Sequence, residues 1–337
     1  MATSERSRFD YKGFFGEITL SHDLISKRDE RTWRLSAPPK NAEHHQYVLY
    51  LGCNVLRTSH MVQTACAVLD RLGLDYVAVG GPTYCCGIVH HQEGDTAAAG
   101  GMSQGTVKLF ERYTPEEVIM WCPSCLYFFD EVQHLALPWP VRQLAEFLVE
   151  RLPEMRFTEV ARRRVALHSH AVSEATRSHG QAARALLAAV PGLEVVHIEP
   201  DPGLGRTCSA AVQKQIGGPE VWDARVRAEI ARAHAAGADT LATMYHGCQR
   251  AMCGFEADAP PPAGPSIEHY LSVFARGLGI EFEDTYKKYR LWADPDRILA
   301  DMTPCQEANA VEQAKARELV ERTFVPVHAL TRGTTPS

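Results

Sequence analysis

Five cysteines in the first 130 residues have the types and spacing of a metal site. They are Cys53, the adjacent pair Cys85 and Cys86, and the pair Cys122 and Cys125, which enclose a Pro-Ser dipeptide. Thiolates are soft, anionic ligands that suit zinc and iron–sulfur clusters. Adjacent cysteine side chains diverge, so both can serve one centre only if that centre is large. Five thiolates exceed the four that tetrahedral zinc accepts, and the spacing therefore favours a multi-iron cluster.

Three other interpretations of these cysteines stay open. Four of the five sulfurs could hold a structural zinc ion. Cys122 and Cys125 could form a thiol redox pair, or the cysteines could simply be small buried side chains. Two further cysteines need no metal: Cys66 lies on the apolar side of an expected helix and is interpreted as core, and Cys305 is interpreted as an incidental thiol.

Each group of cysteines follows a short apolar run that is typical of a buried strand. The runs are Tyr47–Leu51, Tyr76–Val79 and Val118–Trp121, with helical patterns between them. Alternating strands and helices predict an α/β fold with a parallel sheet covered on both faces. Such sheets bind ligands outside the carboxyl ends of their strands, so all five cysteines are expected at one edge.

The second half of the chain repeats this plan. Expected strands at 164–167, 193–198 and 240–244 alternate with helices, and an amphipathic helix over Ile267–Leu278 completes the unit. Cys208 and Cys248 follow Cys86 and Cys122 at similar intervals, which indicates an internal duplication. The predicted organisation is an N-terminal extension (1–46), a first cysteine-rich domain (47–160), a second one with a degenerate motif (161–283) and a helical C-terminal tail (284–337).

The degenerate second set lacks the lone cysteine and the close cysteine pairs of the first. Where a lone cysteine would stand, the sequence has His168 and His170, and only Cys208, Cys248 and Cys253 remain. The site could be an empty relic, or its cysteines could be thiols that act on a substrate. It could also hold zinc or a second cluster with three cysteines plus one of the histidines, since imidazole can replace thiolate at a cluster.

The first set resembles the cysteine-rich CCG domain of the heterodisulfide reductase B-subunit family. That family's pattern is a lone Cys, then Cys-Cys-Gly, then Cys-Pro-x-Cys, with thirty-odd residues between the groups. Here the pattern is Cys53, Cys85-Cys86-Gly87 and Cys122-Pro123-Ser124-Cys125. The motifs cover residues 47–130, and the duplicated architecture extends the resemblance to about residue 280. The resemblance implies that these five cysteines hold a non-cubane [4Fe-4S] cluster.

The same resemblance implies a function as the iron–sulfur subunit of a heterodisulfide reductase-like complex, with disulfide/thiol or sulfur-carrier redox chemistry at the cluster. It also implies two partners, a ferredoxin-like C-type subunit and a flavin-containing A-type subunit. The degenerate second half departs from the methanogen enzyme. It fits better the bacterial sulfur-oxidising branch, whose complex acts with a lipoate-bearing carrier protein. No G-x-G-x-x-G segment follows a strand, so electrons are expected from a partner.

Two alternatives to this function stay open. One is an electron-relay subunit of a hydroxy-acid oxidase complex, although the ferredoxin-type C-x2-C-x2-C-x3-C run of such subunits is missing. The other is a zinc-stabilised assembly module without enzymatic activity. A net charge of -6 without a basic run argues against nucleic-acid binding. The sequence also has no membrane-length apolar stretch and no signal-like start, and it predicts a cytoplasmic location, where clustered thiols serve metal or redox chemistry.

Overall fold

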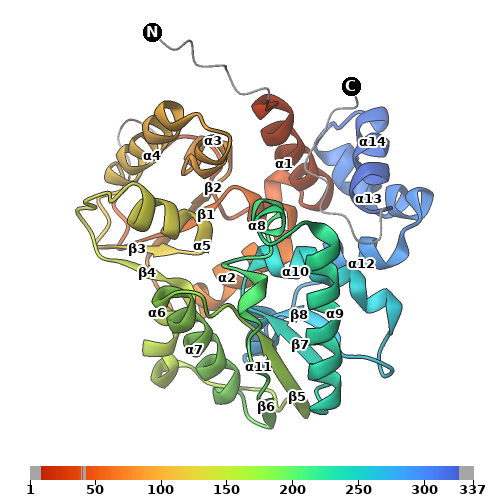
Figure 1. Ribbon diagram of the computed structural model, residues 1–337. Coiled ribbons are helices and arrows are strands. Elements are labelled where there is room, and N and C mark those ends of the chain that lie inside the picture. The colour runs from red at the N-terminus through yellow and green to blue at the C-terminus, as the bar shows by residue number, and fades with distance from the viewer. Residues whose placement is uncertain (1–8, 39, 41–42, 326–337) are drawn as a thin grey trace.

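Two parallel sheets organise the chain (Figure 1). The computed structural model describes residues 9–38, 40 and 43–325, and the predicted N-terminal extension and C-terminal tail reach beyond these limits. Each sheet has four strands, in the orders β2-β1-β3-β4 and β6-β5-β7-β8. The predicted α/β class with two parallel sheets is confirmed. The strands are β1 (Tyr47–Gly52), β2 (Tyr76–Gly80), β3 (Glu117–Met120), β4 (Val141–Gln143), β5 (Arg163–His168), β6 (Leu193–Val196), β7 (Thr240–Thr243) and β8 (Ser266–His269).

The strand sequences explain why each sheet is buried. All six residues of β1 are buried, and Val48 pairs with Val77 of β2 on one side and Val118 of β3 on the other. A continuous apolar run of this kind is what a parallel strand covered on both faces requires. In the second sheet, β5 occupies the equivalent central position between β6 and β7. The identical strand order of the two sheets supports the duplication inferred from the sequence.

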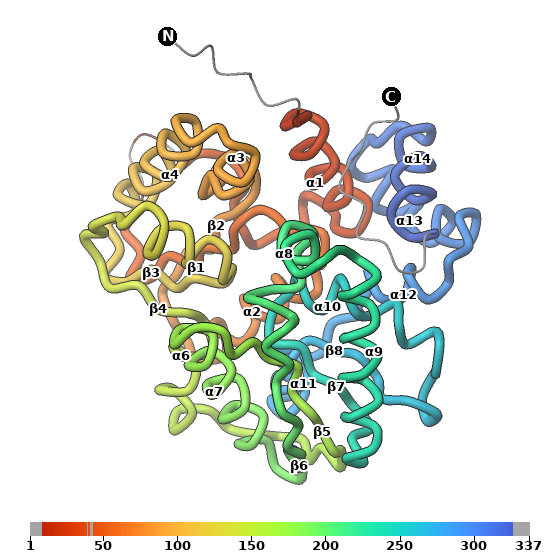
Figure 2. The backbone as a smooth tube through the Cα atoms, in the orientation of Figure 1, coloured from red at the N-terminus to blue at the C-terminus, as the bar shows by residue number. Residues whose placement is uncertain are grey.

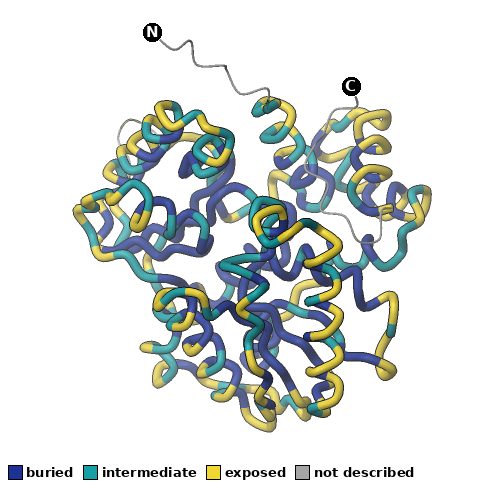
Figure 3. The backbone as a smooth tube through the Cα atoms, in the orientation of Figure 1, coloured by how far each residue is buried: buried dark blue, intermediate teal, exposed yellow. Residues whose placement is uncertain are grey.

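Helices surround both sheets, and Figure 3 shows buried strands beneath helices with exposed outer sides. Several of them begin at side-chain caps; Ser173 and Thr176, for example, form a reciprocal capping box at the start of α7. The helices of the first half are α2 (Ser59–Arg71), α3 (Ile88–Gln92), α4 (Thr96–Glu111), α5 (Pro123–Tyr127) and α6 (Leu144–Glu150). Those of the second half are α7 (Glu174–Ala189), α8 (Ala210–Gln215), α9 (Pro219–Ala235), α10 (His246–Met252) and α11 (Tyr270–Gly277).

The end of each sheet differs from the sequence-based expectation. The expected helix over Ile267–Leu278 starts as strand β8, and only its later part forms α11. The first half has the same arrangement, with β4 leading directly into α6. In both, the last strand residue caps the helix: Gln143 Oε1 accepts from Ala145 N at 2.5 Å, and His269 Nδ1 accepts from Leu271 N at 3.3 Å. The fourth strand of each sheet is therefore a short lead-in to a helix.

The two halves pack through helices that are exchanged reciprocally. The helix after the fourth strand of the first half, α6, contacts α7, which follows the first strand of the second half. The reverse pair, α11 of the second half and α2 of the first, also makes contact. Two copies of one unit related by a pseudo-twofold axis produce such a pattern, in which each contact occurs twice with the roles exchanged.

The two ends of the described chain form a third, helical layer. Helix α1 (Tyr11–Ile25) lies beside the C-terminal helices, as the red and blue tubes of Figure 2 show. Asn309 Nδ2 donates to the carbonyl oxygens of Asp23 and Ser26, at 2.6 and 2.8 Å. The layer has its own apolar cluster, which includes Leu24, Tyr289 and Leu319. The C-terminal helices are α12 (Thr285–Trp292), α13 (Pro295–Ala308) and α14 (Gln313–Thr323).

The helices can also be measured against the dimensions of a bilayer. A membrane-spanning helix needs about 20 predominantly apolar residues. Among the residues that the structure describes, no helix combines that length with that apolar character.

Candidate metal centres

The five cysteines of the first half meet at the carboxyl edge of the first sheet. Cys53 follows β1, the adjacent pair follows β2 after a single 3₁₀ turn, and Cys122 lies just after β3 and opens α5. All five side chains are buried. Their thiols interact in one unbroken series that runs Cys53, Cys85, Cys86, Cys125, Cys122. The structure therefore brings together all five residues of the predicted first site.

The thiol pKa values reflect this crowding. Hydrogen bonds from the Cys53 and Cys86 thiols lower the pKa of Cys85 to about 4, against the effect of burial. The hydrogen bond to Cys85, together with burial, raises the pKa of Cys53 well above its ordinary value. One thiolate is thus stabilised by protonated neighbours. Five buried thiolates would repel one another unless cations neutralised them, so this donor set fits a cationic metal centre.

Two glycines give the sulfurs room. Gly52 has a φ of 75°, and a Cβ atom there would lie 3.1 Å from Cys125 Sγ and 3.1 Å from Cys122 Cβ. Gly87 has a φ of 93°, and a Cβ atom there would lie 2.4 Å from the carbonyl oxygen of Ala99 on α4. Both positions combine a left-handed backbone with a close approach, and only glycine meets both requirements.

Helix α4 holds the turn that carries the adjacent cysteines. Ser103 Oγ donates to the carbonyl oxygen of Cys86 at 2.8 Å, and Thr106 Oγ1 donates to that of Cys85 at 2.9 Å. The backbone N–H of Gly87 points at Cys85 Sγ from 3.4 Å. These bonds satisfy the buried carbonyl groups of the turn and hold the backbone of both cysteines in place.

A second group of possible ligands lies at the carboxyl edge of the second sheet. It consists of His168, His170, Cys208 and Cys248, which are all buried and whose ligand atoms lie within 4.8 Å of one another. His168 Nε2 is 3.3 Å from Cys208 Sγ, and His170 Nε2 is 3.2 Å from Cys248 Sγ. Four of the five residues predicted for a second site thus come together, and both histidines belong to the group.

Cys253 is the predicted residue that the structure does not bring to this group. Its sulfur contacts the carbonyl oxygen of Arg250 at 3.9 Å, and its side chain packs with the apolar cluster of the terminal layer. Burial raises the pKa of its thiol to about 12. Helix α10 separates the two cysteines, because Cys248 lies in its first turn and Cys253 comes just after its end.

In both histidines of the second group Nδ1, the ring nitrogen directed away from the sulfurs, has a hydrogen-bond partner. His168 Nδ1 is 2.9 Å from Glu229 Oε2, and His170 Nδ1 is 2.7 Å from the carbonyl oxygen of Gly205. Burial opposes protonation of His168, but the Glu229 carboxylate and Cys248 together raise its pKa to about 10. Glu229 could not be recognised from the sequence, because nothing in the pattern of α9 distinguishes it from the other acidic residues of a helix.

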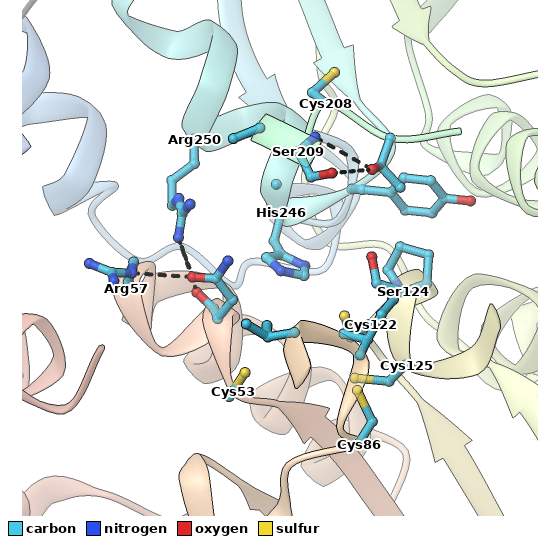
Figure 4. A pocket seen from close by; sticks show the side chains of 18 of the residues that line it. Cys53, Arg57, Cys86, Cys122, Ser124, Cys125, Cys208, Ser209, His246 and Arg250 are labelled. Carbon is cyan, nitrogen blue, oxygen red and sulfur yellow. Dashed lines mark hydrogen bonds between the residues drawn. The ribbon is translucent and has the colours of Figure 1, made fainter. Parts of the chain in front are cut away.

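A pocket separates the two groups (Figure 4). The first-half side includes four of the five cysteines, and the opposite side includes residues next to the second group. The terminal layer closes a third side with Phe14 and Glu17 of α1, Tyr286 of α12 and Thr323 of α14. The two facing walls contain Cys53, Cys86, Cys122 and Cys125 on one side and Cys208, Ser209, Tyr245, His246 and Gly247 on the other.

Two arginines at one end of the pocket were not found from the sequence. Arg57 and Arg250 both donate to Asn54 Oδ1, and Arg57 also pairs with Glu17 at 2.6 Å. Burial and the proximity of Arg57 lower the pKa of Arg250 to about 10, which leaves it charged at neutral pH. Two guanidinium groups against one carboxylate make this end of the pocket positive. The arginines are far apart in the chain, and only the packing of α10 against the turn after β1 brings them together.

The remaining cysteines lie away from both groups. Cys66 is buried in the main apolar core on α2, and burial raises its thiol pKa to about 11. Cys305 lies on α13 in the terminal layer and is partly exposed. Both placements agree with the interpretation of these two residues as thiols without a role in a metal site.

Comparison with known proteins gives one family match and one curated relative. Residues 47–130, which contain all five cysteines of the first group, match the cysteine-rich CCG domain family. The chain is 21% identical over 294 residues to the D-type subunit of the dihydromethanophenazine:CoB–CoM heterodisulfide reductase of Methanosarcina acetivorans. That alignment covers 82% of this chain and 70% of the relative. The resemblance to heterodisulfide reductase is therefore confirmed.

A solved structure of low similarity was also found. It is the crystal structure of PH1733, an aspartate racemase homologue from Pyrococcus horikoshii OT3, with 12% sequence identity. The superposition covers 69% of this chain and 97% of that one, with a TM-score of 0.32. A score this low carries no argument about fold or function.

Proposed function

We propose that this chain, a CCG-domain relative of heterodisulfide reductase, is the iron–sulfur subunit of an oxidoreductase complex that acts on sulfur groups. Its first cysteine group, Cys53, Cys85, Cys86, Cys122 and Cys125, would hold a [4Fe-4S] cluster of the non-cubane type. The observation that carries the proposal is the convergence of five buried cysteines at one sheet edge, four of which line one wall of a pocket. The cysteine-rich domain match over the same residues supports it.

The number and direction of the thiols favour a cluster over a single ion. Zinc uses four ligands, and a fifth thiol in direct contact with the others would remain buried without a metal. A cluster of several irons accepts ligands at separate metal atoms, so the sulfurs of Cys85 and Cys86 can both bind. When bound, such a cluster takes up and releases electrons at a potential that its ligands and hydrogen bonds set.

The pocket would hold the sulfur substrate next to this wall. Reduction of a disulfide to two thiols consumes two electrons and two protons. The electrons would come from partner subunits: a ferredoxin-like C-type subunit, a flavin-containing A-type subunit, or both. A lipoate-bearing carrier protein is the proposed substrate if the chain belongs to the sulfur-oxidising branch. The relative's designation as one subunit of an enzyme supports an assembly with partners.

Charge at the far end of the pocket adds a preference among substrates. Arg57 and Arg250 would attract an anionic group, such as a carboxylate, on a thiol or disulfide whose sulfur reaches the cysteine wall. His246 also lines the pocket, and burial and Arg250 lower its pKa to about 3, so that it is neutral and accepts from Trp121 Nε1 at 3.1 Å. The arginines are thus the positive groups that would orient an acidic substrate here.

Anaerobic purification followed by iron and sulfide quantification and EPR tests the proposal. We expect about four irons per chain, and the Cys86→Ala variant should lose them, because it removes a thiolate from the centre of the sulfur series. Cys66→Ala is the matched control, since it removes a buried cysteine outside the site and should keep full iron. A colourless protein, or full iron in Cys86→Ala, would overturn the assignment.

A further inference from the structure

The second group of ligands has the geometry of a single-metal site. A tetrahedral zinc with Zn–S bonds of about 2.3 Å and Zn–N bonds of about 2.0–2.1 Å separates its ligand atoms by roughly 3.3–3.8 Å. Three of the four sulfur–nitrogen distances in the group are 3.2, 3.3 and 3.9 Å, and all ligand atoms lie within 4.8 Å of one another. A four-iron cluster would instead need its ligands spread over separate irons. The group is therefore compact enough for all four ligands to reach one metal ion.

The surroundings of the histidines point the same way. Metal-bound histidines donate their other ring N–H to a carboxylate or a backbone carbonyl, which fixes the tautomer and directs the second nitrogen at the metal. His168 meets Glu229 in this way and His170 meets the carbonyl of Gly205, so each Nε2 faces the two sulfurs. Two histidines arranged alike, by partners from different segments, are unusual for residues that serve only the core.

Glu229 supplies an independent observation. Its side chain is fully buried, and its Oε1 has no hydrogen-bond partner among the described residues. A buried carboxylate is costly unless positive charge lies nearby. His168 lies between Glu229 and the proposed metal position. A divalent cation bound to His168 Nε2 would therefore supply that charge through the imidazole. Glu229 is thus explained as an outer partner of a metal site.

We propose that His168, His170, Cys208 and Cys248 bind one zinc ion in a closed, tetrahedral site. All four positions are filled by protein, so no position is left for water or substrate, as in structural zinc sites. The ion would join the end of β5, the loop before α8 and the first turn of α10. Cys208 and the residues next to Cys248 line the pocket, so the zinc would brace the wall that faces the five cysteines.

This proposal goes beyond the proposed redox function and does not depend on it. It gives the two halves different tasks, because zinc has no redox chemistry. It also replaces the expectation of three cysteines with two cysteines and two histidines, and it leaves Cys253 outside the site.

X-ray absorption at the zinc edge, on the full-length protein as purified, tests the site without interference from iron. We expect about one zinc per chain, with two sulfur ligands at about 2.3 Å and two nitrogen ligands at about 2.0–2.1 Å. A zinc shell of four sulfurs, or a protein that retains iron but contains no zinc, would overturn the proposal.

Variants separate this site from the first one. Cys208→Ala should lose at least nine-tenths of the zinc and keep its iron, whereas the matched buried control Cys253→Ala should keep both. Loss of zinc from Cys253→Ala with retention in Cys208→Ala would contradict the ligand set. If Cys208→Ala does not fold, the absorption spectrum of the unmodified protein still decides. Failure of the redox proposal would appear as missing iron, and failure of this one as missing zinc.

Discussion

The first site needs a residue without a side chain at position 52, where a glycine stands. The residue is the last of β1, directly before Cys53, with a left-handed backbone and with the sulfur of Cys125 next to its Cβ direction. Any side chain at this position would occupy space that the cysteine wall now uses. The sequence does not single out this glycine, because its importance comes from residues about seventy positions further along the chain.

The Gly52→Ala variant should lose most of its iron. The new Cβ would be forced against Cys122 and Cys125, and the left-handed backbone would add a cost of about 1–2 kcal/mol. Gly73→Ala is the matched control, because Gly73 has a similar φ of 67° but open space around its Cβ direction. It should lose stability in chemical denaturation and keep its iron. Equal iron contents in the two variants would show that the close approach at Gly52 is unimportant.

Arg250 is expected to favour anionic over cationic disulfide substrates. With reduced methyl viologen as electron donor, Arg250→Gln should raise the KM for the anionic disulfide dithiodiglycolate about tenfold, or ~1.4 kcal/mol, with kcat little changed. The KM for cystamine, a cationic disulfide, should not rise, and Arg250→Lys should recover part of the loss for the anionic probe. A change in kcat alone, identical for both probes, would assign Arg250 a role other than substrate binding.

Among the elements, the first three strands of each sheet were predictable from the sequence and the fourth was not. Tyr47–Leu51 and Thr240–Met244 are apolar runs that end at ligand residues, and this pattern is sufficient to place a buried parallel strand. Strand β4, Val141–Gln143, has one apolar residue in three and therefore no periodic signal. The same reason applies to β8, where Ser266 and Glu268 interrupt the pattern. The fourth strand of each sheet is therefore specified by its neighbours rather than by its own residues.

Helix α1 is the second element that the sequence concealed. Residues 1–46 read as a polar extension, yet the structure places α1 within that range and against the turn that follows β1. His22 of α1 makes this contact, with Nδ1 2.8 Å from the carbonyl oxygen of Leu56 and Nε2 accepting from Trp33 Nε1 at 3.0 Å. These partners assign the neutral ring, with its proton on Nδ1.

His22 should make folding stability depend on pH. Burial, together with the positive charge of Arg31, lowers its pKa from 6.5 to about 3, although the Leu56 carbonyl and Asp23 act in the opposite direction. Between pH 6.5 and 3 the unfolded chain then binds more protons than the folded one. Stability should therefore be complete above pH 6.5 and decrease on acidification, by up to about 1.4 kcal/mol per pH unit from this residue.

Denaturation of the His22→Gln variant at several pH values measures this contribution. The variant should be less stable at pH 7 but should lose less stability on acidification than the unmodified protein. His197→Gln, at a histidine whose side chain is largely exposed, is the control and should leave the pH dependence as it is. If the free energy of unfolding of His22→Gln and of the unmodified protein depends on pH in the same way below pH 6.5, protonation of His22 does not contribute to the acid sensitivity.

For the whole molecule, duplication explains why two different sites face one pocket. Both sheets end at equivalent edges, and the reciprocal contacts of α6 with α7 and of α2 with α11 bring these edges toward each other. Each position at the end of a strand therefore occurs twice, once in each half of the chain. In the first half five sulfurs converge, and in the second two imidazoles replace sulfurs. The sequence reveals the two sets of residues, but only the packing of the halves makes them opposite walls.

The hydrogen bonds of Asn309 have a consequence for the order in which parts of the protein can form during translation. Residues 23–28 and 309 are held together, and the layer they join covers one side of the pocket. A ribosome therefore releases both sheets before this cover can form, so the thiols of the first group would stay accessible until late in translation. Chains that end at residue 284 should take up iron as readily as complete ones. Their visible iron–sulfur absorption should decay faster in air, because dioxygen would enter where the terminal layer is missing.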